Sequence, residues 1–174
     1  MISYLFGGIV ADFISPKKLI SVSLVLTGLA GFSHLFVSNY SMLLIIYLVW
    51  GFTSLFAFWP SLVKGIRSIA GSDEQSKAYG FMEGGRGIMN AVHLAVALAM
   101  FNYISSKAND AAGIKGVITF YSIVMVVLGV LVFILLKDPG KTDKSERFNF
   151  KQLLTVIKMP QVWILSLILC ATYT

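Results

Sequence analysis

The polar residues best suited to chemistry lie between residues 79 and 93, in the stretch Tyr-Gly-Phe-Met-Glu-Gly-Gly-Arg-Gly-Ile-Met-Asn-Ala-Val-His. Arg86, Asn90 and His93 follow at i, i+4 and i+7, so a helix places them on one face with Glu83 at its edge. Arginine offers a planar fork to a carboxylate, phosphate or sulfonate. Asn90 adds a neutral hydrogen bond, and His93 can donate a hydrogen bond or take a proton near neutral pH. The stripe predicts a binding site for a small organic anion, in which Glu83 neutralises Arg86 when the site is empty.

The depth of Arg86 in this helix depends on where the helix begins. A start near Ser76, with Asp73 as N-cap, puts Arg86 about 15 Å along the helix, near a bilayer midplane. A start nearer Phe81 leaves Arg86 one turn inside, as a cytoplasmic charge. His93 has a second interpretation, as a structural histidine. The surrounding glycines are expected to allow close packing or bending of this helix; they are Gly80, Gly84, Gly85 and Gly87.

The composition places this helix in a membrane. The chain of 174 residues is 57% apolar and 13% charged, whereas soluble domains are about 45–50% apolar and about 25% charged. No Asp, Glu, Lys or Arg occurs from Leu19 to Val63, a run of roughly 68 Å if helical. That length is enough for two membrane crossings, and a polar turn at 38–41 divides it. A soluble enzyme is excluded.

The remaining charge-free runs complete the predicted fold class, an all-α integral membrane helical bundle. Four whole spans are predicted, at Lys18–Val37, Met42–Val63, Gly87–Ser106 and Gly116–Leu136. The apolar ends Met1–Phe13 and Pro160–Thr174 reach only about 20 Å as helices, less than a hydrocarbon core of about 30 Å. We interpret both as partial spans. For the first, the rival interpretation is a signal peptide, but no basic residue precedes the apolar run and Asp12 follows it.

The basic residues indicate the orientation. The net charge is +6, and all Lys and Arg except Lys107 and Lys115 fall on one side of the predicted spans. By the positive-inside rule that side is cytoplasmic, so loops 14–17, 64–78 and 137–159 face the cytoplasm of a multi-pass protein in the cell (inner or plasma) membrane. The charge therefore reflects topology, and no nucleic acid partner is expected.

The segment 137–159 is predicted to be a cytoplasmic linker, because Asp138-Pro139-Gly140 stops the preceding helix. Within it, residues 149–158 carry apolar side chains at helical spacing, which predicts a short amphipathic helix at the inner membrane interface. The alternative is a helix packed on another cytoplasmic loop.

The first family motif lies at the cytoplasmic end of the first partial span. Gly8 and Asp12 are four residues apart and lie on one helix face, and Lys17 and Lys18 follow. This pattern resembles the signature between the second and third helices of the major facilitator superfamily, although Phe13 stands where that family usually has Arg or Lys. The resemblance implies a role for these four residues, together with Glu83, in gating or a charge relay. The alternative for Asp12 is a solvated interfacial carboxylate.

The second family motif is Trp59-Pro60 followed by Lys64. Proline removes a backbone hydrogen bond and kinks a helix, and Lys64 can reach the inner interface. The motif is similar to the fourth helix of the organophosphate and organic-anion branch of the same superfamily, which implies a kinked gating element. Alternatively, Trp59 is an interfacial anchor and Lys64 a positive-inside charge.

The resemblance covers the whole chain and implies helices two to seven of twelve. Residues 1–136 then belong to the N-terminal half, 137–159 to the loop between the halves and 160–174 to the seventh helix. It implies a fragment of a secondary transporter that moves a small organic anion by alternating access. The expected partners are the lipid bilayer, a small anionic solute, a coupling proton or cation, and the remaining helices of the transporter. A non-transporting receptor or scaffold on the same helices is the alternative.

Enzyme, metal and cofactor sites are not predicted. Cys170 is the single cysteine, and His34 and His93 are far apart in sequence. No phosphate loop, zinc-binding helix or nucleophile elbow occurs. His34 is interpreted as structural or interfacial.

Overall fold

The computed structural model describes residues 14–71, 73–137, 159–164 and 167. The chain divides into two compact units, Met1–Lys141 and Thr142–Thr174. In the second unit, residues 160–164 are helical, where a partial span is predicted. The first partial span with Gly8 and Asp12, and the amphipathic helix, lie outside the described residues. The predicted division at 136 and 159 stays a prediction.

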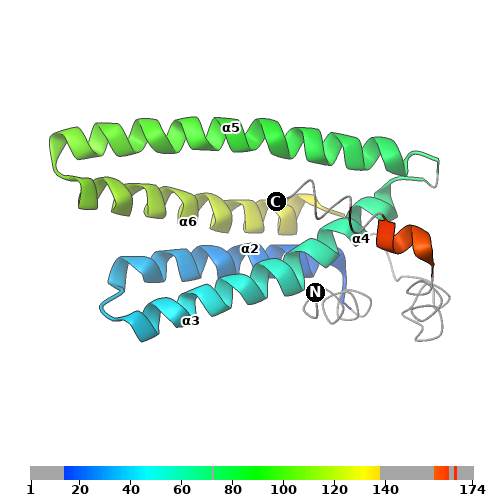
Figure 1. Ribbon diagram of the computed structural model, residues 1–174, viewed down its shortest axis with the longest axis horizontal. Coiled ribbons are helices and arrows are strands. Elements are labelled where there is room, and N and C mark those ends of the chain that lie inside the picture. Colours follow the sequence, from blue (N-terminus) through cyan, green and yellow to red (C-terminus); the bar gives the residue numbers. More distant parts are fainter. Residues whose placement is uncertain (1–13, 72, 138–158, 165–166, 168–174) are drawn as a thin grey trace. The chain divides into compact units, whose positions relative to one another are not determined.

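The described part of the first unit is made of helices, with no strand among its residues (Figure 1). In chain order these are α2 (Pro16–Ser33), the 3-10 turn η1 (His34–Phe36), α3 (Tyr40–Gly51), the π-helix η2 (Phe52–Phe58), α4 (Trp59–Ile69), α5 (Gln75–Lys107) and α6 (Asp110–Leu135). They form four segments long and apolar enough to cross a membrane, because α3, η2 and α4 run on as one, Tyr40–Ile69. The all-α class and the four whole spans are confirmed.

Short polar side chains start three of these segments, as expected where a helix leaves backbone N–H groups without a partner. Ser15 accepts from the Lys18 N–H before α2. Asn39, in the predicted turn, accepts from the Met42 N–H at 2.8 Å, and Asn109 caps α6 in the same way. The prediction for α5 was wrong by one residue: Glu74, not Asp73, is the N-cap, and its side chain makes no capping bond.

Glycine brings α2 and α6 into close contact. A Cβ atom added at Gly28 would lie 2.7 Å from Val126 Cγ2 and 2.8 Å from the Ser122 carbonyl oxygen. On α6, a Cβ at Gly129 would lie 3.0 Å from the Ser21 carbonyl oxygen. Inside a membrane the hydrophobic effect does not drive apolar helices together, because lipid tails are as apolar as the side chains. Close approach of the two backbones is therefore a main source of helix association. The α2–α6 contact is therefore set by small residues.

The glycines of α5 behave differently from the prediction. A Cβ added at Gly80, Gly84, Gly85 or Gly87 would meet no atom within 4 Å among the described residues. The close packing expected at these four positions is not found in this part of the chain. The reason is that α5 meets α6 through its second half, where a Cβ at Gly113 of α6 would touch the Phe101 ring.

A buried polar network fixes the end of α3 and the start of η2 on α2. The Ser23 hydroxyl donates to the Thr53 carbonyl oxygen at 2.5 Å, and the Thr27 and Thr53 hydroxyl oxygens are 2.8 Å apart. The Trp50 indole N–H donates to the Thr27 carbonyl oxygen at 3.0 Å. In an apolar surrounding such groups need partners, so this network defines the position at which the helix changes from α3 to η2.

The irregularity predicted at Pro60 takes the form of the π-helix η2. The Trp59 N–H bonds to the Ser54 carbonyl oxygen, five residues earlier. Pro60 has no N–H to donate, and its ring would clash with the carbonyl four residues before it in a regular α-helix. The wider turn of a π-helix avoids that conflict, and such turns are frequent at functional sites. Trp59 becomes the first residue of α4.

Candidate substrate-binding site

The structure shows where the helix that carries Arg86 begins. The helix begins at Gln75, so Arg86 lies about 16 Å along it, and the start near Phe81 is wrong. The helix has 33 residues, roughly 50 Å, which exceeds a hydrocarbon core of about 30 Å. Arg86 is about 8 Å from the midpoint of the helix, at Ala91. A bilayer centred on α5 would therefore enclose Arg86.

Arg86 forms an ion pair with Glu83 on its own helix. The Arg86 Nε and Nη2 atoms both donate to Glu83 Oε2, the first at 3.0 Å. Both side chains keep a substantial exposed fraction, 39% for Arg86 and 42% for Glu83. The pair expected from the i, i+3 spacing is thus present, and neutralisation lowers the cost of a charge within an apolar helix.

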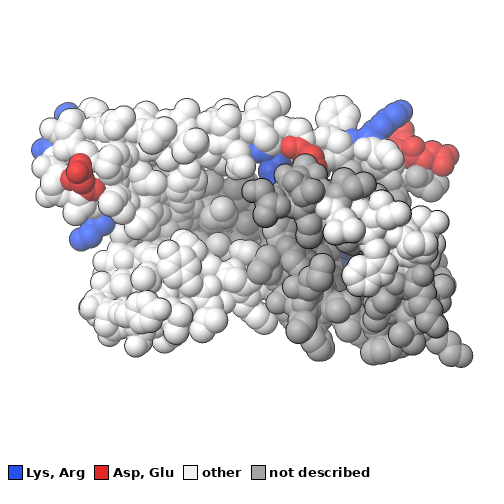
Figure 2. All heavy atoms as spheres, in the orientation of Figure 1, with Lys and Arg blue, Asp and Glu red and all other residues white. Residues whose placement is uncertain are grey.

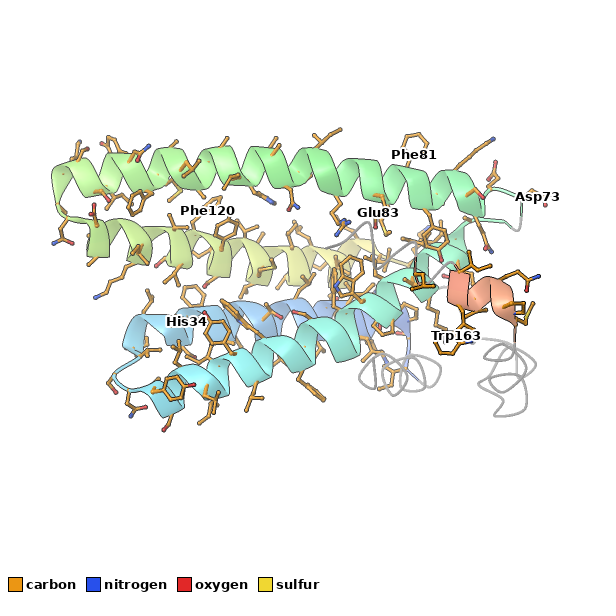
Figure 3. The ribbon with its side chains drawn as sticks, viewed as in Figure 1. His34, Asp73, Phe81, Glu83, Phe120 and Trp163 are labelled. Atoms are coloured by element: carbon orange, nitrogen blue, oxygen red, sulfur yellow. The ribbon has the colours of Figure 1, made fainter. Side chains whose placement is uncertain are left out.

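The charged residues of the described chain are distributed unevenly. Figure 2 shows them gathered near the helix ends, with one mixed pair well inside the apolar surface. Figure 3 shows Glu83 on the side of α5 that faces the other helices, whereas Phe81 points the opposite way. Phe81 is 84% exposed. The Glu83–Arg86 pair therefore faces the interior of the bundle and not the outer surface of α5.

Trp59 from α4 lies against the same arginine. The Arg86 guanidinium carbon is 5.6 Å from the centre of the Trp59 ring, a cation–π geometry. Four residues further along α4, the Val63 carbonyl oxygen accepts a hydrogen bond from the Tyr79 hydroxyl at 3.2 Å. The two contacts hold one face of α4 on one face of α5, and they join two motifs that are 27 residues apart in the sequence.

Asn90 and His93 continue the stripe away from α4. Asn90 is exposed. The half-buried His93 ring lies edge-on to Tyr121 of α6, with ring centres 6.1 Å apart. The Tyr121 hydroxyl donates to the His93 carbonyl oxygen at 3.2 Å. The predicted stripe thus meets α4 at one end and α6 at the other.

The remaining predicted residues that the structure describes lie on α2 and α4. Lys17 lies over the Phe133 ring at 5.1 Å, and Lys18 is exposed. Lys64 lies on α4, one turn beyond Pro60. The gating roles of these residues, like those of Gly8 and Asp12, stay predictions.

Two partners of the stripe were missed from the sequence. Trp59 was assigned to a helix kink, and Tyr121 was not singled out. Neither has a local signal, since each meets the stripe only through the packing of two helices. His34 packs against the rings of Tyr47 and Trp50, with ring centres 5.7 and 4.7 Å away, in keeping with its structural interpretation. Over the described ranges, no group of three or more His, Cys, Asp or Glu is arranged to hold a metal ion.

The comparison with known proteins defines the family. The model of the Major Facilitator Superfamily matches residues 1–174, and the chain belongs to that family. Its all-α membrane fold is an incomplete form of the family's helical bundle.

Individual relatives show how much of a family member the chain represents. The chain is 30% identical to the inner membrane protein YihN of Escherichia coli over 90% of its length. It is 26% identical to the inner membrane protein YqcE of the same organism over 100% of its length. It is 25% identical to the uncharacterized protein MG294 homolog of Mycoplasma pneumoniae over 96% of its length. The chain spans 38–42% of the length of these relatives. No solved structure shows a significant match.

Proposed function

We propose that the protein represented by this chain is a secondary transporter that moves a small organic anion across the inner membrane by alternating access. Family membership and relatives named as inner membrane proteins support the transporter class and the location. The observation that supports an anionic substrate is the arrangement around Arg86. This residue lies near the midpoint of α5, forms an ion pair with Glu83 and is covered by the Trp59 ring. The chain spans about two fifths of the length of its relatives. In this proposal, helices of the remaining part of the protein complete the substrate cavity.

The chemistry of the Glu83–Arg86 pair explains how a solute anion can bind to Arg86. An ionised side chain in the apolar part of a membrane is costly and is retained mainly at functional positions. Glu83 already supplies the carboxylate that the Arg86 guanidinium needs, through Nε and Nη2. A carboxylate, phosphate or sulfonate presents the same acceptor oxygens and can replace Glu83 without leaving the arginine unpaired. The exchange keeps Arg86 paired, and the released Glu83 carboxylate, whose side chain is 42% exposed, must then be hydrated by water.

The other predicted residues take supporting roles in this proposal. Asn90, one turn from Arg86, donates a neutral hydrogen bond to the solute. His93 donates a hydrogen bond or carries the coupling proton. Asp12 with Lys17 and Lys18 contributes to the cytoplasmic gate, and α4 moves at Pro60. The organophosphate and organic-anion branch, and cytoplasmic loops 14–17, 64–78 and 137–159, belong to the same proposal.

The test is transport by the full-length protein in proteoliposomes, with inorganic phosphate, a hexose phosphate, a hexuronate and an alkyl sulfonate as probes. Lysine keeps the charge of arginine but not the bidentate fork. We expect Arg86→Lys to lower uptake of the transported probe at least 10-fold, with unchanged expression and membrane insertion. Arg67→Lys, at an exposed position near the end of α4, is the matched control and should transport normally. Undiminished uptake by Arg86→Lys would remove Arg86 from the binding role.

A further inference from the structure

Among the contacts that the structure describes, two from different helices bear on the orientation of the Arg86 guanidinium. Glu83, on α5 itself, binds one edge through Nε and Nη2. Trp59, on α4, covers the guanidinium with its ring at 5.6 Å. An edge contact alone leaves the guanidinium plane able to rotate, so the contact from α4 adds the constraint that the ion pair lacks.

The position of Trp59 is itself built into the fold. The end of α3 is bonded to α2 through Trp50, and the start of η2 is bonded to α2 through Thr53, whose carbonyl oxygen accepts from the buried Ser23 hydroxyl. The π-helix η2 follows directly and ends at Phe58, so its wide turn sets the rotation of α4 relative to α3. The result is that Trp59 faces α5.

A second contact shows that this orientation is not limited to one side chain. Trp59 and Val63 are four residues apart and share a face of α4, and Tyr79 and Arg86 are seven apart and share a face of α5. Val63 accepts a hydrogen bond from Tyr79, and Trp59 lies against Arg86. Both contacts have the register of two antiparallel helices, so α4 is held at the level of the arginine.

We propose that Trp59 is a positioning residue that holds the plane of the Arg86 guanidinium so that its fork is oriented before the anion arrives. This inference rests on the proposed role of Arg86 as the anion ligand. The indole face neither donates nor accepts a conventional hydrogen bond, so it restrains the guanidinium without occupying the bonds that the anion needs. Without Trp59 the long arginine side chain must be ordered when the anion binds, and affinity falls.

The first experiment compares Trp59→Leu with Trp59→Phe in the reconstituted full-length protein, using the probe that the wild-type protein transports. Losing the order of one long side chain corresponds to about a 2- to 12-fold rise in KM. We expect that rise in Trp59→Leu, with less than a twofold change in Vmax, and recovery of most of the loss in Trp59→Phe, which keeps an aromatic face. Phe81→Leu, the same kind of change at an 84% exposed position of α5, should leave KM unaltered.

A second measurement covers the case in which Trp59→Leu does not fold. Stepwise fluorination of the indole at position 59 withdraws charge from the ring face but keeps its shape, so it weakens a cation–π contact selectively. We expect KM to rise with each added fluorine. A KM that is unchanged by fluorination and by Trp59→Leu, while Arg86→Lys still abolishes uptake, would overturn the positioning role alone. Normal uptake by Arg86→Lys would instead overturn the proposed function.

Discussion

The α2–α6 contact and the first half of α5 both contain several glycines, yet their surroundings differ. At Gly28 a single added carbon would collide with the Ser122 backbone of the neighbouring helix, whereas at Gly84 it would meet no described atom. The α2–α6 contact contains small hydroxyl residues, and α5 carries the Glu83–Arg86 ion pair. Glycine content alone therefore does not identify a packing surface, and the charged pair lies on the part of α5 whose glycines meet no described atom within 4 Å.

The variants with the largest expected effect on stability replace the glycines of the two regions and so test the contrast between them directly. Gly28→Ala places a methyl group against backbone that cannot move aside, which we expect to destabilise the protein by about 1–3 kcal/mol. Gly84→Ala meets open space and gains helix propensity, so it should stabilise α5 by roughly 0.5–1 kcal/mol. Thermal unfolding of the purified full-length protein measures both changes.

The paired design gives each glycine variant its own control, because the substitution is identical and only the surroundings change. A fall in the unfolding temperature of Gly84→Ala as large as that of Gly28→Ala would show that a part of the protein outside the described residues covers α5. The contrast between the two regions would then be lost.

A smaller effect is expected from the hydrogen bond that anchors η2 on α2. Ser23→Ala removes the donor to the Thr53 carbonyl oxygen, and interhelical hydrogen bonds in membranes contribute about 0.6 kcal/mol on average. We expect a small drop in the thermal unfolding temperature. Ser33→Ala on the same helix is the matched control, because the Ser33 hydroxyl bonds only to the Leu29 carbonyl oxygen of its own helix. Equal effects of the two variants would remove Ser23 from the anchoring role.

The smallest expected effect concerns His93. This residue belongs to the polar stripe of α5, but its ring packs against Tyr121 of α6. If His93 carries a proton during transport, His93→Gln should flatten the dependence of uptake on pH, because a glutamine side chain cannot take up that proton. We expect the variation of uptake with pH to be smaller in His93→Gln than in the wild-type protein. The measurement is uptake of the transported probe at a series of pH values.

The control for this prediction is His34→Gln, since His34 packs against Tyr47 and Trp50 at the end of α2. It should leave the pH profile intact. An unchanged profile in His93→Gln would place His93 with the residues that only pack helices together.

Much of the fold could be predicted because the signals are local. A charge-free run of sufficient length must cross the bilayer, and the polar turn predicted at 38–41 contains Asn39, which caps α3. The i, i+3 spacing likewise predicted the Glu83–Arg86 pair, since neighbours on one helix meet whatever surrounds them. The details that failed, such as Asp73 as the N-cap, depend on the last turn of a helix, where several residues compete for the same role.

By itself, the amino-acid sequence determined the four membrane-spanning segments, their helical class and the polar stripe on α5, because hydropathy and helical periodicity act over a few turns. Only the tertiary structure decided that Trp59 covers Arg86, that Tyr121 meets His93, and that α2 and α6 approach closely at Gly28. Each of these contacts joins residues 27 or more positions apart. Which distant faces meet depends on the rotation and register of whole helices, here set in part by the π-helix before Pro60.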